Sequence, residues 1–204
     1  MTAPSELRQR HFEALYAASD DPWDVRGSWY ERRKRALLLA CLGKPRYRNV
    51  FEPGCGNGEM SFALAARCNR LLACDASPSA LAAARRRVAD TPAGCELRFA
   101  EASLPGDWPS GQGFDLIVIS ELGYYFDEGA LRTLFDQAGA SLDAGGELVL
   151  CHYRRDFDDR ASTTAAVHAA AGATRGLERV VRHEDRDFLL EAWRQTTGAP
   201  GSAT

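Results

Sequence analysis

The sequence lacks a Cys-x-x-Cys pair, an apolar run long enough to cross a membrane and an excess of positive charge. Its six cysteines are scattered through apolar runs, which predicts free thiols in a reducing cytoplasm rather than a disulfide framework. No window approaches the roughly 20 apolar residues of a membrane span, and the start lacks the order of a secretory signal. The net charge of −3 predicts no nucleic-acid partner. We therefore expect a cytoplasmic protein that binds neither membrane nor nucleic acid.

The dinucleotide-binding fingerprint Gly-x-Gly-x-x-Gly is also missing, although a glycine-rich turn is present. A short apolar run ends at Glu52, and glycines follow at positions 54, 56 and 58. The third glycine comes one residue too early for that fingerprint, which disfavours a nicotinamide oxidoreductase. An acid two residues before Gly-x-Gly-x-Gly is instead the pattern of class I S-adenosylmethionine (SAM) methyltransferases. The stretch 49–59 resembles the cofactor loop of that family.

Strand-like and helix-like patterns alternate after this point. We predict strands ending at Glu52 and covering 71–75, 96–101, 114–120 and 147–152, helices over 59–67, 77–88 and 128–142, and two late strands at 177–182 and 188–193. The order predicts an α/β fold with a doubly wound, mostly parallel seven-stranded sheet and a late antiparallel hairpin. Helices at 5–18 and 29–42 precede it, so we expect a helical cap over 1–45 and a SAM-binding core over 46–197. The second helix is expected to place Glu31, Arg32, Lys34 and Arg35 on its polar face.

The ends of the first three strands hold the residues expected to bind the cofactor. The loop of Gly54, Cys55 and Gly56 lets backbone approach a ligand, while Glu52 holds the loop amides or receives the amino group of SAM. Asp75 lies 21 residues after Gly54 and can accept both ribose hydroxyls, with Ala76 beside the adenosine. In the family, the adenine amino group is contacted where Glu101 and Ala102 stand; a solvated loop acid is the alternative for Glu101.

The end of the fourth strand is expected to face the acceptor. Ser120 and Glu121 are followed by Tyr124 and Tyr125, and the Asn/Asp-Pro-Pro-Tyr/Phe motif of enzymes that methylate planar amides and bases is absent. Glu121 could accept a hydrogen bond from an amine or hydroxyl, and the tyrosines either line the pocket or only pack. His152, after the fifth strand, either takes a proton from a hydroxyl or has a structural role. Its acidic neighbours have no metal-ligand spacing, so we expect no metal.

Three segments extend the family resemblance. Asp-Pro-Trp at 21–23 with the basic cluster up to residue 34, the run 114–126 and the run 145–155 resemble the nodulation protein S family of methyltransferases, over about residues 10–155. The resemblance implies methylation of a free amino group on a deacetylated chitooligosaccharide. It implies that Glu121 is the acid that positions the amine. It also implies that the acceptor pocket is lined by Tyr124, Tyr125, His152 and Arg154. It also implies that Trp23, Tyr30 and Arg33 close over SAM, with Arg33 near its carboxylate.

Other interpretations stay open at this point. The segment 156–175 is rich in alanine and poor in aromatic residues, whereas a sugar-binding groove needs stacking surfaces, so another small acceptor and methylation at oxygen are kept. The tryptophans and basic residues before the core could also only attach a helix to the sheet. A non-catalytic SAM-binding protein and, less favoured, a nicotinamide enzyme are the alternatives from other classes.

Overall fold

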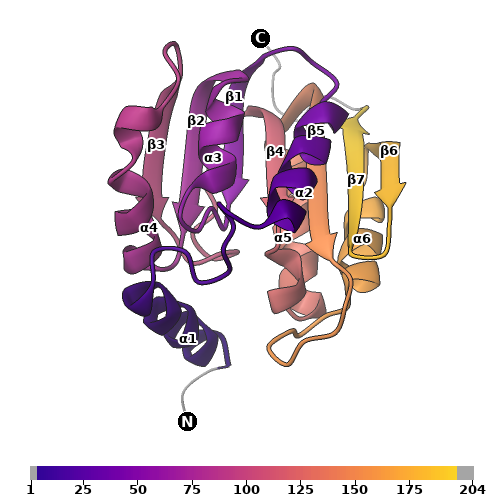
Figure 1. Ribbon diagram of the computed structural model, residues 1–204. Helices are drawn as coiled ribbons and strands as arrows, with labels where there is room; N and C mark the ends of the chain where they lie inside the picture. The colour runs from indigo at the N-terminus through magenta and orange to yellow at the C-terminus, as the bar shows by residue number, and fades with distance from the viewer. Residues whose placement is uncertain (1–3, 197–204) are drawn as a thin grey trace.

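One seven-stranded sheet forms the centre of the molecule, in the order β3-β2-β1-β4-β5-β7-β6 (Figure 1). The computed structural model describes residues 4–196. The strands are β1 (Tyr47–Pro53), β2 (Cys68–Asp75), β3 (Glu96–Glu101), β4 (Phe114–Ser120), β5 (Leu142–Tyr153), β6 (Leu177–Glu184) and β7 (Phe188–Gln195). The first five strands pair in parallel, and β7 runs antiparallel between β5 and β6. The predicted doubly wound sheet with a late hairpin is confirmed.

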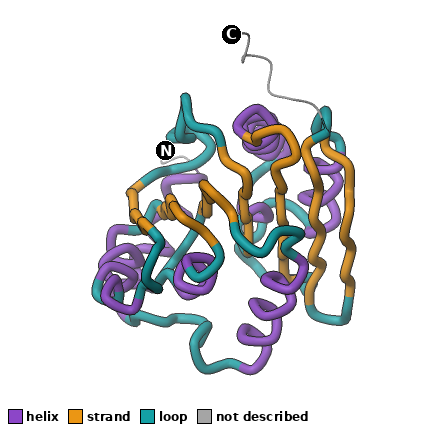
Figure 2. The backbone as a smooth tube through the Cα atoms, turned by 90° about the horizontal axis from the view of Figure 1, so that it is seen from above, coloured by secondary structure: helices purple, strands orange, loops and turns teal. Residues whose placement is uncertain are grey.

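Helices cover both faces of this sheet (Figure 2). One face carries α2 (Trp29–Cys41), α3 (Glu59–Ala65) and α4 (Pro78–Arg85), and the other carries α5 (Glu128–Ser141) and α6 (Thr164–Gly172). The central strand β4 is apolar on both sides, so Leu116 and Val118 enter one core while Ile117 and Ile119 enter the other. Within residues 4–196 no helix combines the length and the apolar character that crossing a membrane requires.

The remaining helix, α1 (Pro4–Ala18), lies across the carboxyl ends of the strands (Figure 1). It contacts α4 and the loop after β2, where Glu13 accepts hydrogen bonds from the hydroxyls of Ser77 (2.6 Å) and Ser79 (2.5 Å). The predicted boundary between cap and core falls between α2 and β1. Residue 197, the last of the predicted core, lies outside the described residues.

β2 begins three residues earlier than predicted, and α4 ends at Arg85, three residues before the predicted end. Three further features differ more from the expectations. The alanine-rich segment after β5 forms α6, which starts at a Thr163 side chain that accepts a hydrogen bond from the amide of Ala166. Strand β5 begins five residues earlier than predicted, because Leu142 pairs with Phe114 across an irregularity in the register. Lys34 does not lie on a solvated helix face: only 3% of it is exposed.

Candidate active site

The glycine loop and Asp75 form one hydrogen-bonded unit at the carboxyl ends of β1 and β2. The carboxylate of Asp75 accepts from the amides of Gly56 (2.8 Å) and Ser77 (2.9 Å). Gly54, Gly56 and Gly58 have φ values of 72°, 53° and 81°, a region that side chains rarely adopt. Burial raises the pKa of Asp75, against the lowering effect of the amides of Ser77 and Gly56. The strand end predicted to bind the ribose therefore meets the loop predicted to bind the rest of SAM.

Glu52 lies beneath the loop rather than in it. Only 3% of the residue is exposed, and its carboxyl accepts a hydrogen bond from the hydroxyl of Ser61 at 2.5 Å. Burial raises the pKa of Glu52 to about 8, although the bond from Ser61 lowers it. The Glu52 carboxyl is thus bonded to α3, the helix that follows the loop. Cys55, in the loop itself, is 7% exposed.

The amino-terminal segment covers this unit through two contacts, of Tyr16 and of Asn57, that the sequence analysis did not predict. A Cβ atom on Gly56 would overlap the hydroxyl of Tyr16 in α1, so this tyrosine touches the loop backbone. Burial, with the negative charge of Asp75 next, raises the pKa of Tyr16. Asn57 donates to the carbonyl of Asp20 at 3.0 Å and to Asp21 at 3.1 Å. The only sequence signal was the place of Tyr16 in the apolar stripe of a helix.

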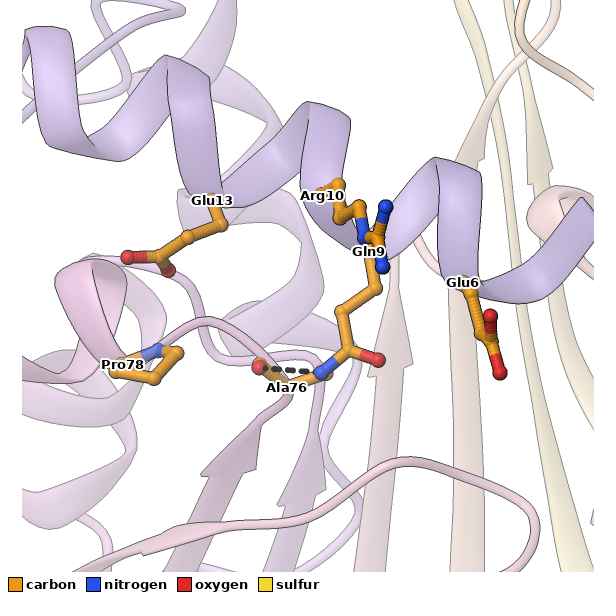
Figure 3. Close-up of a pocket in the computed structure, with 6 residues that line it drawn as sticks. All are labelled: Glu6, Gln9, Arg10, Glu13, Ala76 and Pro78. Atoms are coloured by element: carbon orange, nitrogen blue, oxygen red, sulfur yellow. Dashed lines mark hydrogen bonds between the residues drawn. The ribbon is translucent and has the colours of Figure 1, made fainter. Parts of the chain in front are cut away.

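A surface pocket of about 290 Å³ lies between α1 and the loop after β2 (Figure 3). Gln9 donates to the carbonyl oxygen of Ala76 at 3.1 Å across one side of it. Its lining is Glu6, Gln9, Arg10, Glu13, Ala76 and Pro78. Ala76, expected beside the adenosine, therefore has its carbonyl held by the helix that covers the site.

Trp23, Tyr30 and Arg33, which the resemblance groups around SAM, do not lie together: Tyr30 and Arg33 both pack against Phe188 of β7, whereas Trp23 packs against α1. Trp23 is 45% exposed and packs edge-on against Tyr16 at 5.4 Å, so it reaches the loop through that residue. The Tyr30 hydroxyl is buried without a hydrogen-bond partner among residues 4–196. Arg33 pairs with Asp185 in the β6–β7 turn at 2.6 Å. In this structure Arg33 is directed away from the glycine loop.

Three further residues expected to contact SAM lie at or just after the ends of β3 and β4. Glu101 is exposed and aligned with Asp75 across the β2–β3 pair, and the amide of Ala102 donates to the carbonyl of Asp75 at 3.0 Å. Ser120 ends β4 and is half-buried. These three residues stand at the sheet edge where ligands of open α/β sheets bind.

Glu121 is the centre of the opposite part of the site. Its Oε1 atom accepts from the ammonium of Lys34 at 2.7 Å, and its Oε2 atom accepts from the Tyr153 amide at 3.1 Å and from the Tyr124 hydroxyl. Lys34 also pairs with Glu31 at 2.8 Å. Burial lowers the pKa of Lys34, but Glu121 and Glu31 outweigh it and raise the pKa overall. The Glu121 side chain keeps 28% exposure, so it is not fully buried by these contacts.

The turn that carries Glu121 packs against the glycine loop. Glu121 itself has a φ of 54°, an uncommon conformation for a residue with a side chain, and a Cβ on Gly54 would stand 3.0 Å from the side chain of Leu122. Tyr124 and Tyr125 follow in a 3₁₀ turn, with ring centres 4.8 Å apart. Tyr124 is buried, whereas Tyr125 is half-buried and contacts Phe12 of α1 at 4.8 Å. The structure thus brings the predicted acceptor residues next to the predicted cofactor loop.

His152 does not fit the expected role of a base that takes a proton from the substrate. It is 0% exposed, its Nε2 atom accepts from the amide of Gly123 at 3.0 Å, and its Nδ1 atom contacts Nε2 of His168 at 3.1 Å. Burial holds the pKa of His152 well below its usual range. Of the two roles considered for this residue, the geometry matches the structural one.

Arg154 lies at the rim of the sheet rather than in the site. Its guanidinium pairs with Glu184 at 2.6 Å and donates to the carbonyl of Asp185. Both partners belong to the β6–β7 hairpin. Among the described residues, no group of three His, Cys, Asp or Glu side chains is arranged to hold a metal ion.

Residues 50–146 match the family model described as a methyltransferase domain. The chain is 34% identical to nodulation protein S of Rhizobium tropici over 134 residues, which is 65% of this chain but only 55% of that relative. A crystal structure from Pseudomonas syringae, provisionally described as a methyltransferase, is 47% identical with a TM-score of 0.69, covering 82% of this chain and 99% of that one.

The N-methyltransferase NodS of Bradyrhizobium japonicum, solved with S-adenosyl-L-homocysteine, is 26% identical with a TM-score of 0.79 over 93% of this chain and 98% of that one. The chemistry of the residues here fits such a ligand, since the glycine loop presents backbone without side chains of its own and Asp75 offers a carboxylate beside it. The glycine loop, the sheet order and these similarities together show that the chain belongs to the SAM-dependent methyltransferases and is similar to nodulation protein S.

Proposed function

We propose that the protein transfers the methyl group of SAM to a free amine on a small acceptor, with amino sugars as the first class to test. The observation that carries this proposal is Glu121, a partly exposed side chain that is held by Lys34 and precedes Leu122, which packs against the glycine loop. The description of the Bradyrhizobium relative as an N-methyltransferase supports the choice of nitrogen.

The cofactor side of the site would bind mainly through backbone and one carboxylate. Asp75 would accept the ribose hydroxyls while its bonds from Gly56 and Ser77 hold it in place. Glu52 would support the loop, and Tyr16 would cover it from α1. Trp23, Ala76, Glu101, Ala102 and Ser120 would complete the surroundings of the nucleoside, and Tyr30 and Arg33 would reach SAM only after leaving their present positions. Bound SAM supplies an activated methyl group on a sulfonium, so the chain need only position the acceptor.

The acceptor side would orient the amine and receive its proton. An amine attacks only when its lone pair is free, and an open position on Glu121 can accept a hydrogen bond from the amine N–H while the nitrogen faces the methyl group. Tyr124 and Tyr125 would form the wall behind it. Excluding water from the space between Glu121 and the two tyrosines would strengthen these contacts.

Nitrogen is favoured over oxygen because a hydroxyl acceptor needs a stronger base. His152, the base expected for that reaction, is buried and has both ring nitrogens engaged. A cytoplasmic setting belongs to the same proposal, since all six cysteines are free thiols and four of them are buried. So does the absence of a nucleic-acid partner, which the net charge of −3 supports.

A matched pair of acceptors tests the proposal. Glucosamine and N-acetylglucosamine have the same hydroxyl groups but only the first has a free amine, so release of S-adenosylhomocysteine with glucosamine alone, and a methyl group located on nitrogen by mass spectrometry, supports amine methylation. Methylation of both sugars at oxygen contradicts it. Tight SAM binding with no methylation across a broad set of amines would favour a non-catalytic SAM-binding protein.

A further inference from the structure

A chain of buried polar side chains crosses the core behind the acceptor side of the site. His152 contacts His168 at 3.1 Å, and Nδ1 of His168 contacts a carboxylate oxygen of Glu191 at 2.8 Å. The three residues are 0%, 4% and 1% exposed, and they come from β5, α6 and β7. Burying polar groups is costly unless each finds a partner, and here each one does.

The donor and the acceptor of each hydrogen bond in this series follow from the bond that the Gly123 amide makes to His152. The amide of Gly123 can only donate, so Nε2 of His152 must accept, and a neutral His152 then carries its proton on Nδ1. That proton is donated to Nε2 of His168, which leaves the proton of His168 on Nδ1, facing Glu191. Burial lowers the pKa of both histidines, which agrees with neutral rings.

The outer end of the chain is an ionised carboxylate. The second oxygen of Glu191 accepts from Arg182 at 2.7 Å and from Arg179 at 2.9 Å, both in β6. Burial raises the pKa of Glu191, but the bonds from His168 and Arg182 outweigh it and lower the pKa overall. Because a carboxylate accepts but cannot donate, Glu191 sets the tautomer of His168 and, through it, that of His152.

The inner end of the chain holds the turn that presents Glu121. Gly123 lies two residues after Glu121, whose positive φ costs energy and persists only where its surroundings hold it. A Cβ at Gly123 would overlap Val167 of α6 and stand 3.0 Å from Nε2 of His152. The same turn is held on its other side by the amides of Ala161 and Ser162, which donate to the Tyr124 carbonyl at 2.8 and 3.0 Å.

We propose that Glu191, His168 and His152 act as a positioning network that fixes the turn at Gly123 and thereby aims the Glu121 carboxylate at the acceptor. The inference rests on the proposed function, because it assigns Glu121 its role there. None of the three residues touches substrate. Their effect is transmitted through one hydrogen bond to the Gly123 amide.

Glu191→Gln is the most informative variant, because it keeps the shape of the side chain while allowing donors and acceptors to be exchanged along the hydrogen bonds of the two histidines. A glutamine that accepts from the arginines presents its NH₂ group to His168, which moves the proton of His168 to Nε2 and that of His152 to Nε2, against the donor amide of Gly123. Glu184→Gln is the matched control, since Glu184 also pairs with Arg182, and its ion-pair partners within residues 4–196 are two arginines and neither histidine.

Two measurements test the network. Nitrogen NMR of the wild type is expected to show His152 protonated on Nδ1, and Glu191→Gln is expected to shift the amide signals of Gly123 and Glu121 while Glu184→Gln leaves them in place. With an amine acceptor, kcat is expected to fall about tenfold in Glu191→Gln with the SAM dissociation constant unchanged.

Wild-type His152 protonated on Nε2, or unshifted Gly123 and Glu121 amides in Glu191→Gln, overturns the proposal. So does a kcat equal to that of the Glu184→Gln control. If no amine acceptor is methylated by the wild type, the proposed function fails separately. The tautomer and the amide shifts then still decide whether the network holds the turn, because they need no substrate.

Discussion

The two halves of the sheet form their parts of the site in different ways. On the β1–β3 side, the contact from Gly56 to Asp75 joins residues 19 positions apart, and it uses a backbone amide. On the β4–β7 side, Lys34 reaches Glu121 across 87 positions, and His168 meets Glu191 from another helix and strand. The first half depends on local backbone geometry and the second on buried charge brought together by the fold. Substitutions on the β1–β3 side should therefore affect ligand binding, and substitutions on the β4–β7 side should affect stability or turnover.

The largest effect is expected from Lys34→Met on the acceptor side. This change leaves Glu31 and Glu121 near each other without their shared cation, so we expect the free energy of unfolding to fall by about 3 kcal/mol. Urea unfolding followed by circular dichroism measures it. Lys44→Met replaces the only other lysine and is the control. Equal stability of the two variants would show that the buried pair is not held together as described.

Asp75→Ala should have the next largest effect, and it should appear in binding. Loss of the ribose contact and of the anchor for the Gly56 amide is expected to weaken SAM binding by about 100-fold. Titration calorimetry measures the dissociation constant. The control is Glu96→Ala, which removes an exposed acid at the opposite end of β3. A similar loss in both variants would contradict the special role of Asp75.

Glu121→Gln separates the two halves directly. The carboxamide keeps the shape of the side chain but accepts protons poorly, so kcat with an amine acceptor should fall about 10- to 100-fold. The SAM dissociation constant should stay within about twofold, because Glu121 belongs to the other half. Glu128→Gln, on the exposed first residue of α5, serves as the control. Unchanged turnover in the Glu121 variant would remove this residue from the chemistry.

The smallest effect concerns acid stability. Burial holds the pKa of His152 and His168 below the unfolded value of about 6.5, so the unfolded chain binds more protons as the pH falls. Stability conferred by the neutral rings is present above that pH and is lost below it, by at most about 1.4 kcal/mol per pH unit for each histidine. Unfolding in urea at pH 7, 6 and 5 measures the slope, which should shrink when both histidines are replaced by glutamine. A wild-type slope near zero would count against the buried neutral pair.

The same contrast explains what the sequence could predict. Alternating apolar runs and turn residues located every strand, and the spacing from the glycine loop to Asp75 was sufficient to place them together because neighbouring parallel strands end at one edge. Polar residues on the acceptor side were harder to interpret. Lys34 was expected on a solvated face, because it stands in a run of four basic residues and charged residues of a helix usually face water. Nothing in its neighbourhood indicates a partner 87 positions away.

The histidines show the same limit. His152 follows a strand at the ligand edge, a position typical of a catalytic base, and its burial depends on α6, which the alanine-rich sequence did not reveal. Alanine is compatible with a helix, but the segment's weak apolar pattern gave no face to recognise. His168 and Glu191 become informative only when α6 and β7 are placed side by side.

The position of Lys34 in α2 has a consequence for exchanging parts between relatives. The segment before β1 packs over the core as α1 and α2, yet its Lys34 supplies the cation next to Glu121. A chimaera that replaces this segment would therefore change the charge next to Glu121 as well as the helices that cover the glycine loop. Attempts to transfer acceptor preference from one relative to another would have to move α2 along with the turn after β4.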